Sequence, residues 1–379
     1  MKNSRTLSLI MAAFVMIAMT FSANAAQVES EKAPAGMPCF SLRWSEYPSW
    51  SVFGVADSFR LIDGRKGWIS TIEKKWGVDI ELKEAEYDPC LQMYGSGQCD
   101  AVCITNMDVL NPSLTRKSVV IMPSSTSYGA DGCIVVKNEI GDITALRGVP
   151  VYGLEKTVSQ YAFVRNLELL GEKEADHKFT NMDPGAAALA MQQKQKNFNA
   201  IMVWNPFVLE TLNKRPDTKV LFDSRTIPGE IIDTISMAQD SLDKPGGEAF
   251  ACAVIDTFYA VCKRLADPKT SDDTTVAIGE KFSHLNLASM KKVLQQTRFY
   301  DTPDMALEMM TGGKLFPGGK VQTDGNLPEI MERVVKFCVG HDITSKEPVV
   351  GYGNKAQAGK SDLRWDTTYI RQVVAKNKK

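Results

Sequence analysis

The chain has 379 residues, and its 44 Lys and Arg against 45 Asp and Glu leave a net charge of −1 at pH 7. A chain of this length exceeds one ordinary core and predicts two lobes or domains. The balanced charge provides no global field for nucleic acid or an anionic membrane, and we expect neither as a partner.

The first residues predict an export leader. Lys2 and Arg5 precede an almost unbroken apolar run from Leu7 to Phe21, and Ala23-Asn24-Ala25 supplies small residues for cleavage. The apolar run is short for a membrane span, and no later segment approaches 18 consecutive apolar residues. We expect a signal peptide over residues 1–25, a mature chain free in the periplasm, and no membrane anchor.

Strands and helices then alternate along the chain, after a flexible lead over residues 26–38. Such alternation predicts parallel sheets flanked by helices, in which ligands bind beyond the carboxyl ends of the strands. The predicted strands are 39–44, 78–85, 100–105, 118–122, 133–136, 149–153, 200–203, 219–222 and 231–238. The main predicted helices are 68–76, 88–94, 158–170, 183–195 and 247–266, with shorter ones reaching residue 61 and opening at 205.

The cysteines leave two interpretations open, disulfides in an oxidising compartment or buried thiols. Spacing separates Cys252 from Cys262 by about 15 Å on one helix, and Cys99 from Cys103 by about 13 Å along a strand, beyond disulfide reach. No C-x-x-C motif is present and no histidine is spaced near a cysteine pair, so we expect no metal and no cofactor. The eight residues are Cys39, Cys90, Cys99, Cys103, Cys133, Cys252, Cys262 and Cys338.

Four segments together resemble one known family. Residues 200–207 (AIMVWNPF) resemble its D-A-x-x-x-W-x-P motif, and residues 95–101 (GSGQCDA) its L-x-S-G-Q-x-D turn. Residues 142–151 and 227–233 are similar to the segments that lead into the second lobe and return to the first. The family is the nitrate/sulfonate/taurine solute-binding proteins of ABC importers. Asn199 departs from it, standing where the family often carries Asp.

The resemblance implies a type II periplasmic-binding fold, in which two α/β lobes are joined by two crossover segments and enclose the ligand between them. It also implies an ABC permease and its ATPase as partners, and we expect a monomer. The expected division is lobe 1 over 39–142 and 229–340, lobe 2 over 143–228, and a polar C-terminal extension over 341–379.

Loops at the predicted strand ends bring together aromatic walls and oriented polar groups, as expected for a small polar ligand. The candidate binding residues are Glu46, Tyr47, Trp50, Thr105, Asp108, Ser125, Tyr128, Thr157, Ser159, Gln160, Asp183, Trp204 and Asn205.

Several candidates also have simpler interpretations. Thr157 to Gln160 could bind an anion at a helix N-terminus, or Thr157 could simply cap that helix. Glu46, Asp108 and Asp183 could meet a cationic group or remain solvated, and Asp183 also fits a helix cap before Pro184. The aromatic residues could be ordinary core.

Catalytic motifs are missing from the sequence. There is no G-x-S-x-G elbow, H-E-x-x-H helix or glycine-rich phosphate loop, so no catalytic residue is assigned. One enzyme branch of this fold, which makes a pyrimidine, carries a tight cysteine cluster, whereas the cysteines here are scattered. We predict a non-enzymatic protein that reversibly captures a small polar organic solute, sulfonate-like or zwitterionic. The alternative is an exported sensor or interaction subunit that presents its ligand state to a membrane receptor.

Overall fold

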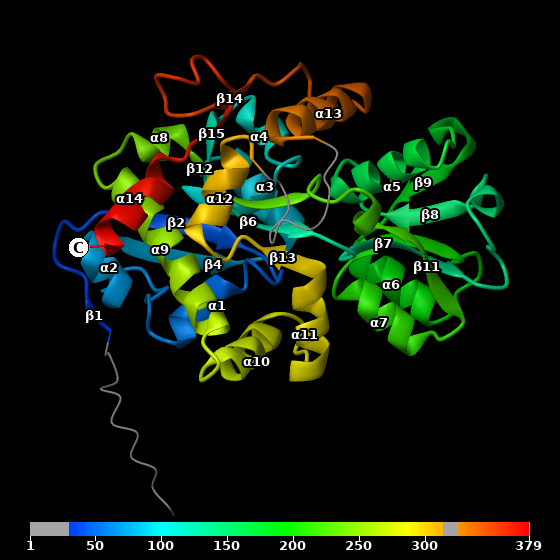
Figure 1. Cartoon of the computed structure of the whole chain (residues 1–379), viewed down its shortest axis with the longest axis horizontal. Helices are drawn as coiled ribbons and strands as arrows, with labels where there is room; N and C mark the ends of the chain where they lie inside the picture. Colours follow the sequence, from blue (N-terminus) through cyan, green and yellow to red (C-terminus); the bar gives the residue numbers. More distant parts are fainter. Residues whose placement is uncertain (1–29, 314–324, 379) are drawn as a thin grey trace, which may run out of the picture.

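Two β-sheets, each flanked by helices, form two lobes that lie side by side (Figure 1). The computed structural model describes residues 30–313 and 325–378, so the predicted leader and the first four residues of the lead lie outside the described residues. The prediction of an α/β fold with parallel-rich sheets is confirmed.

The larger lobe is built on an eight-stranded sheet. β2 runs parallel to β4 and β5, whereas β12 runs antiparallel to β5 and β6. Its strands, in spatial order, are β14 (Val350–Tyr352), β15 (Leu363–Trp365), β6 (Ser118–Ser127), β12 (Ile232–Ala238), β5 (Ala101–Thr105), β2 (Cys39–Trp44) and β4 (Asp79–Glu84), with β13 (Thr297–Phe299) paired to β6.

The smaller lobe has a five-stranded sheet in which β8 is parallel to both its neighbours, β9 and β10, and β7 is antiparallel to β10 and β11. The apolar run of β10 is buried along four of its five residues, as expected for a strand covered on both faces. The order is β11 (Thr218–Asp223), β7 (Asp131–Val136), β10 (Ala200–Trp204), β8 (Pro150–Gly153) and β9 (Lys178–Asn181).

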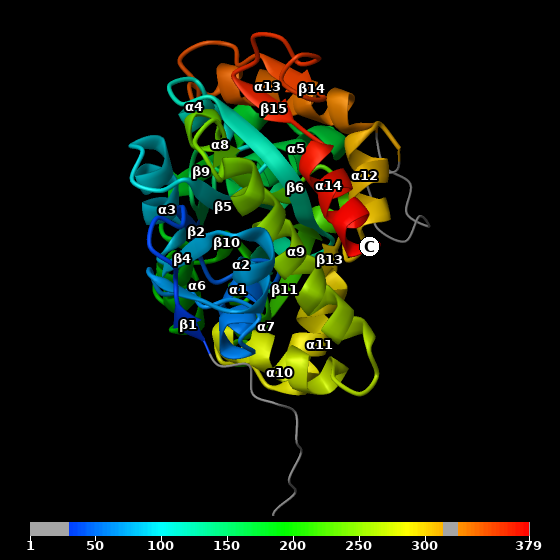
Figure 2. The same cartoon turned by 90° about the vertical axis from the view of Figure 1, so that its left-hand side faces the viewer.

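Helices cover both sheets, and the long helix α9 packs against α1, α2, α10 and α14; Figure 2 shows it between α1 and α2 on one side and α14 on the other. The larger lobe has α1 (Val52–Ser58), α2 (Thr71–Trp76), α3 (Tyr87–Gly95), α4 (Leu110–Ser113), α8 (Gln239–Leu242), α9 (Gly247–Ala266), α10 (Ser271–Lys281), α11 (Leu287–Gln296), α12 (Pro303–Met310), α13 (Leu327–Gly340) and α14 (Thr368–Asn377). The smaller lobe has α5 (Val158–Leu169), α6 (Pro184–Gln192) and α7 (Phe207–Lys214).

Local capping explains where two of these helices begin. Asp183 accepts a 2.9 Å hydrogen bond from the amide of Ala186, with Pro184 at the first helical position of α6, as the sequence predicted. The helix predicted over 68–76 is shorter, because a strand, β3 (Trp68–Ile69), pairs with β1 (Glu31–Lys32) and a capping box of Ser70 and Glu73 starts α2 afterwards.

The chain changes sheets twice, between β6 and β7 and again between β11 and β12. β7 pairs with β10 and β11, whereas the division expected from the sequence left residues 131–136 in the first lobe. That division placed the strands predicted over 118–122 and 133–136 in one lobe. In the structure β6 pairs with β12 and β7 pairs with β10, so the two strands belong to different sheets.

Strand β6 continues through four hydroxyl residues beyond residue 122, where the strand predicted from the sequence ended. These residues are buried, and each hydroxyl has a partner within the fold. Ser124 pairs with Ser49, Thr126 donates to the carbonyl of Ile231, and Ser125 and Ser127 donate to carboxylates of the site described below. Satisfied hydrogen bonds allow a polar run to remain in a buried strand.

The C-terminal residues complete the larger lobe. β15 adds in parallel to β6, β14 adds to β15, and α14 packs against α9. Trp365 and Ile370 are fully buried there. The polar C-terminal extension expected over 341–379 therefore contributes two sheet strands and part of the core.

The smaller lobe also contacts helix α13 of the larger lobe. The buried carboxylate of Glu230, in the returning crossover, accepts a 2.8 Å hydrogen bond from Arg333 of α13 and bonds from Tyr161 and Arg165 of α5. The ring of Phe337 packs edge-on against that of Tyr161 at 5.2 Å. These contacts brace the two lobes beside the crossover.

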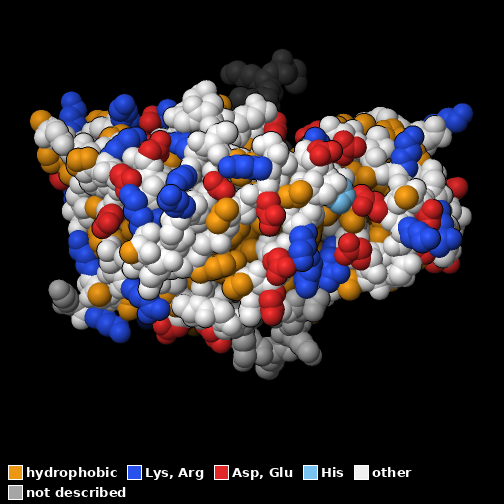
Figure 3. All heavy atoms as spheres, turned by 90° about the horizontal axis from the view of Figure 1, so that it is seen from above, with side chains coloured by type: hydrophobic (Ala, Val, Ile, Leu, Met, Phe, Trp, Pro, Cys, Tyr) orange, Lys and Arg blue, Asp and Glu red, His pale blue; other side chains and the backbone are white. Residues whose placement is uncertain are grey.

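Surface charge, helix hydropathy and the cysteines were also compared with what the sequence predicted. Side chains of both charge signs are interspersed over the face shown in Figure 3. None of the helices in the described residues has the length and apolar character needed to span a bilayer. All eight cysteines lie within the described chain, where each is a free thiol and seven are buried.

We predict that Ile370→Ala lowers the free energy of unfolding by about 2–5 kcal/mol, because it opens a cavity in the core formed with α14. The matched control is Val349→Ala, whose parent side chain is 55% exposed and should change stability by less than about 0.5 kcal/mol. Urea unfolding followed by circular dichroism measures both, and equal midpoints for the two variants would contradict the packing of this segment.

Candidate functional site

A cavity of about 370 Å³ lies between the two lobes, and residues of both lobes line it. The lining combines aromatic rings with carboxylates. It comprises Ser45, Glu46, Tyr47, Trp50, Glu86, Tyr87, Asp88, Pro89, Thr105, Ile231, Asp233 and Ser283 from the larger lobe and its crossover, and Asp131, Leu154, Val158, Asp183, Pro184, Trp204, Pro206 and Phe207 from the smaller lobe.

Strand ends position most of this lining. In the larger lobe β2, β4 and β5 end next to the loops and residues that reach the cavity. In the smaller lobe β8, β9 and β10 end in the same way, before Leu154, Asp183 and Pro206. Parallel strands end at one edge of their sheet, so each lobe presents its carboxyl-end edge to the cavity.

The two antiparallel crossover strands bring a carboxylate to the same edges. Asp131 begins β7 and pairs in register with Trp204, the last residue of β10. Asp233, near the start of β12, pairs with Thr105, the last residue of β5. Because an antiparallel partner starts where its neighbour ends, each lobe carries an aspartate beside its last parallel-strand residue.

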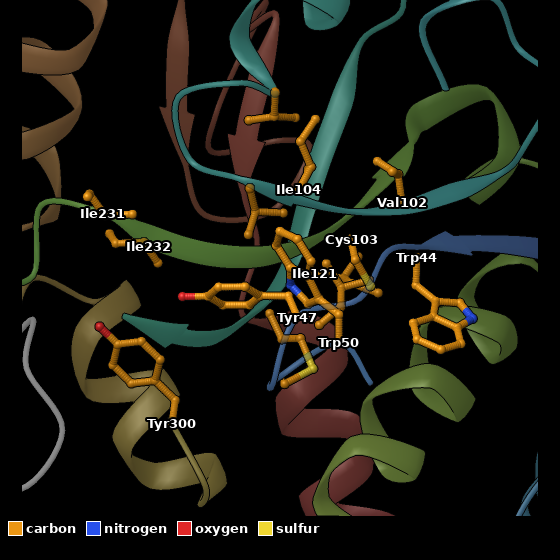
Figure 4. Packing of buried hydrophobic residues seen from close by; sticks show 14 of the residues in the cluster. Trp44, Tyr47, Trp50, Val102, Cys103, Ile104, Ile121, Ile231, Ile232 and Tyr300 are labelled. Carbon is orange, nitrogen blue, oxygen red and sulfur yellow. The ribbon is translucent and has the colours of Figure 1, made fainter. Parts of the chain in front are cut away.

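Aromatic rings form a continuous wall across the cavity. Tyr47 packs on Trp50 with ring centroids 4.9 Å apart, and both rings lie against the larger-lobe core (Figure 4). Trp50 stacks on Tyr87 at 5.6 Å with an angle of 11° between the planes, and Trp204 of the other lobe meets Tyr87 edge-on at 6.3 Å. The wall therefore crosses from one lobe to the other.

A buried carboxylate fixes the Tyr87 ring. Asp108 accepts hydrogen bonds of 2.7 Å from the Tyr87 hydroxyl and 2.8 Å from the Thr105 hydroxyl. Burial raises the pKa of Asp108 to about 6, while the two hydroxyl donors lower it in part. Asp108 therefore acts behind the cavity wall and positions two residues that line it.

The two cavity aspartates are paired only with hydroxyl groups in the described chain. Ser127 donates to Oδ2 of Asp131 at 2.5 Å, and Ser125 donates to Oδ2 of Asp233 at 2.5 Å. Burial raises the pKa of Asp131 to about 6 and raises the pKa of Asp233 well above its ordinary value, and neighbouring aspartates add to both shifts.

Six of the candidates named from the sequence line the cavity, and the other seven lie behind or beside it. The lining six are Glu46, Tyr47, Trp50, Thr105, Asp183 and Trp204. Of the others, Asp108 and Ser125 support lining residues through the hydrogen bonds given above. Asn205 donates to the side chain of Gln296 at 2.8 Å, and Tyr128 has the guanidinium of Arg298 over its ring at 5.7 Å.

At the start of α5, the structure shows the helix cap that was one of the two interpretations of residues 157–160. Thr157 accepts a 3.3 Å hydrogen bond from the amide of Ser159 and caps the helix. The side chain of Gln160 accepts from the amide of Lys156 at 2.8 Å, and Ser159 is buried. Only Val158 of this segment lines the cavity.

Sequence reasoning missed several lining residues. Tyr87 and Asp88 follow β4 and obey the same strand-end rule as the candidates that were named, so this loop could have been found. Asp131 and Asp233 lie at the starts of their strands, and only the register with β10 and β5 brings them to the cavity. Phe207 reaches it from the first turn of α7.

No family model and no curated protein matches the chain. Solved structures do. The periplasmic aliphatic sulphonate binding protein of Escherichia coli has a TM-score of 0.61 at 17% identity, over 82% of this chain and 94% of that one. The alkanesulfonate-binding protein of Xanthomonas axonopodis pv. citri, bound to MOPS, has a TM-score of 0.59 at 12% identity, over 84% of this chain and 96% of that one.

A gene product of Candida albicans, described as defining a new family with the generic periplasmic binding protein fold, has a TM-score of 0.57 at 11% identity, over 90% of this chain and 95% of that one. This chain has the periplasmic-binding-protein fold. The cavity of this chain lies at the junction of its two lobes, which is where the ligand was expected from the sequence.

The charged groups of the site do not form a metal centre. Within residues 30–313 and 325–378, no group of three or more His, Cys, Asp or Glu side chains is placed to hold a metal ion. Cys103 and Cys133 are buried in the sheets, and burial raises the pKa of both thiols. These two thiols are therefore protonated at neutral pH.

We predict that Asp131→Asn stabilises the ligand-free protein at pH 7.5 but changes its stability little at pH 3.5. The carboxyl pKa rises from 3.8 to about 6 on folding, so the folded state holds an extra proton between these values and stability falls as pH rises through them. The amide avoids that loss, which is about 1–3 kcal/mol above pH 6. Unfolding midpoints across this range measure the difference, and a stability difference independent of pH would contradict it.

Proposed function

We propose that the chain is the solute-binding component of an ABC importer, which reversibly captures a small organic solute between its lobes. The observation that carries the proposal is the aromatic-walled cavity at the facing strand ends of two lobes. Its volume of about 370 Å³ suits a small molecule, and apolar walls with a few oriented polar groups are typical of such sites.

The fold supports the same function. Two of the similar structures are sulfonate-binding proteins, and one of them is called periplasmic. We accordingly place the mature protein in the periplasm as a monomer, with an ABC permease and its ATPase as partners. The solute is sulfonate-like or zwitterionic, and binding rather than turnover is the activity.

A thermal-shift screen of the purified mature protein tests this function. Its ligands are taurine, alkanesulfonates, nitrate, bicarbonate, amines and pyrimidines. A ligand that binds only the folded state at a hundred times its Kd stabilises it by about 2.7 kcal/mol, which raises the melting temperature. A screen in which no small solute raises the melting temperature would contradict solute capture.

We further predict that Trp204→Ala lowers the affinity for the ligand found in that screen by about tenfold or more, because it removes the smaller lobe's part of the aromatic wall. Trp68→Ala is the matched control, since Trp68 lies in β3 with its ring under the guanidinium of Arg65 and outside the cavity lining. Isothermal titration calorimetry measures both affinities. Equal losses in the two variants would place the ligand elsewhere.

A further inference from the structure

The charged residues around the cavity all have one sign. Among the described residues that line it, six carry carboxylates and none is Lys, Arg or His. The carboxylates are Glu46, Glu86, Asp88, Asp131, Asp183 and Asp233. An anionic ligand placed here would meet repulsion without a basic partner from this lining, whereas a cation would be attracted.

The aspartates nearest the strand ends are buried without a cationic partner. Asp131 is 3% exposed and Asp233 is 2% exposed, and their described hydrogen bonds come from serine and tyrosine hydroxyls. The charges of Asp131 and Asp108 are among the main causes that raise the pKa of Asp233. Buried carboxylates of this kind are costly unless a positive group pairs with them.

One carboxylate oxygen is available to a ligand. The described hydrogen bond to the Asp131 side chain ends on Oδ2, where Ser127 donates, and the residue lines the cavity. Its Oδ1 can therefore accept a hydrogen bond from a donor inside the cavity. An N–H group with positive charge forms the stronger, charge-assisted type of bond to such an oxygen.

The aromatic wall favours the same kind of ligand. Trp50 and Tyr87 stack nearly parallel, and Trp204 closes on Tyr87 from the other lobe. The faces of tryptophan and tyrosine rings attract ammonium groups through their quadrupoles, most strongly where water is excluded. Aromatic faces next to unpaired carboxylates thus supply two independent attractions for an organic cation, and the cavity is far larger than a bare ion requires.

We propose that the solute carries a protonated amine, which donates to Asp131 and packs against the partly exposed rings of Tyr87 and Trp204. This inference rests on the proposed function and names its substrate class: an organic ammonium compound, with or without an anionic group elsewhere. Asp233 supplies a second carboxyl group from the larger lobe, and an adjacent ammonium favours the ionised form of that group. The ammonium then links the two lobes, because its counter-charges come from both.

Isothermal titration calorimetry of the purified mature protein tests this with matched probes. The ammonium probes are ethanolammonium, putrescine, benzylammonium and taurine, the quaternary probe is choline, and the anions are ethanesulfonate and nitrate. We expect at least one N–H-bearing ammonium probe to bind, and neither anion. Asp131→Asn and Asp233→Asn should each lower the affinity for that probe by about tenfold or more.

The control variant is Glu139→Gln, an exposed carboxylate outside the cavity lining, which should leave the affinity unchanged. Circular dichroism verifies that each variant is folded.

Binding of ethanesulfonate or nitrate that Asp131→Asn strengthens or leaves unchanged would overturn the cation inference while leaving solute capture intact. Binding of Ca²⁺ or Zn²⁺ with no organic cation, or of choline alone, would also overturn it. If no probe of either charge binds and the broader solute screen is also empty, the proposed function itself fails.

Discussion

The site depends on the antiparallel pairing of one crossover strand in each sheet with the last parallel strand of that sheet. This register places Asp131 beside Trp204 and Asp233 beside Thr105. A shift of one residue would turn these side chains to the opposite face of the sheet, so the pairing that forms each core also sets the site. The crossovers that join the lobes are therefore the segments that supply the two buried aspartates.

Burial gives those aspartates their chemical character. The polar end of β6 offers them hydroxyl donors, and hydroxyls satisfy hydrogen bonds without neutralising charge. Asp131 therefore retains an unfavourable buried charge at neutral pH, which a cationic solute relieves. A cation bound there contacts both lobes, since each lobe contributes one of the two aspartates.

Much of the fold could be predicted because its signals are local. The apolar run at 200–203 and the Asp183-Pro184 cap each identify an element without reference to distant residues. The strand-end rule then identified Trp204 as a lining residue, whereas Asp183 was named only for its charge because β9, the strand before it, was not predicted. Asp131 and Asp233 escaped prediction because their position depends on register between strands far apart in sequence. The serine-rich end of β6 escaped for the same reason, since its burial depends on partners such as Ser49 and Ile231.

In the proposed binding mode, a solute lies between the lobes with a cationic group against the crossover aspartates, Asp131 and Asp233. The fold alone leaves the solute's charge open, and the carboxylates of this cavity are the observation that favours a cation. A crystal structure of the protein with its best-binding solute is the most direct measurement. The account predicts an ammonium nitrogen within about 3 Å of Asp131 Oδ1 and within about 6 Å of the centre of an aromatic ring. An anionic group in that position, or a solute bound outside the cavity, would contradict it.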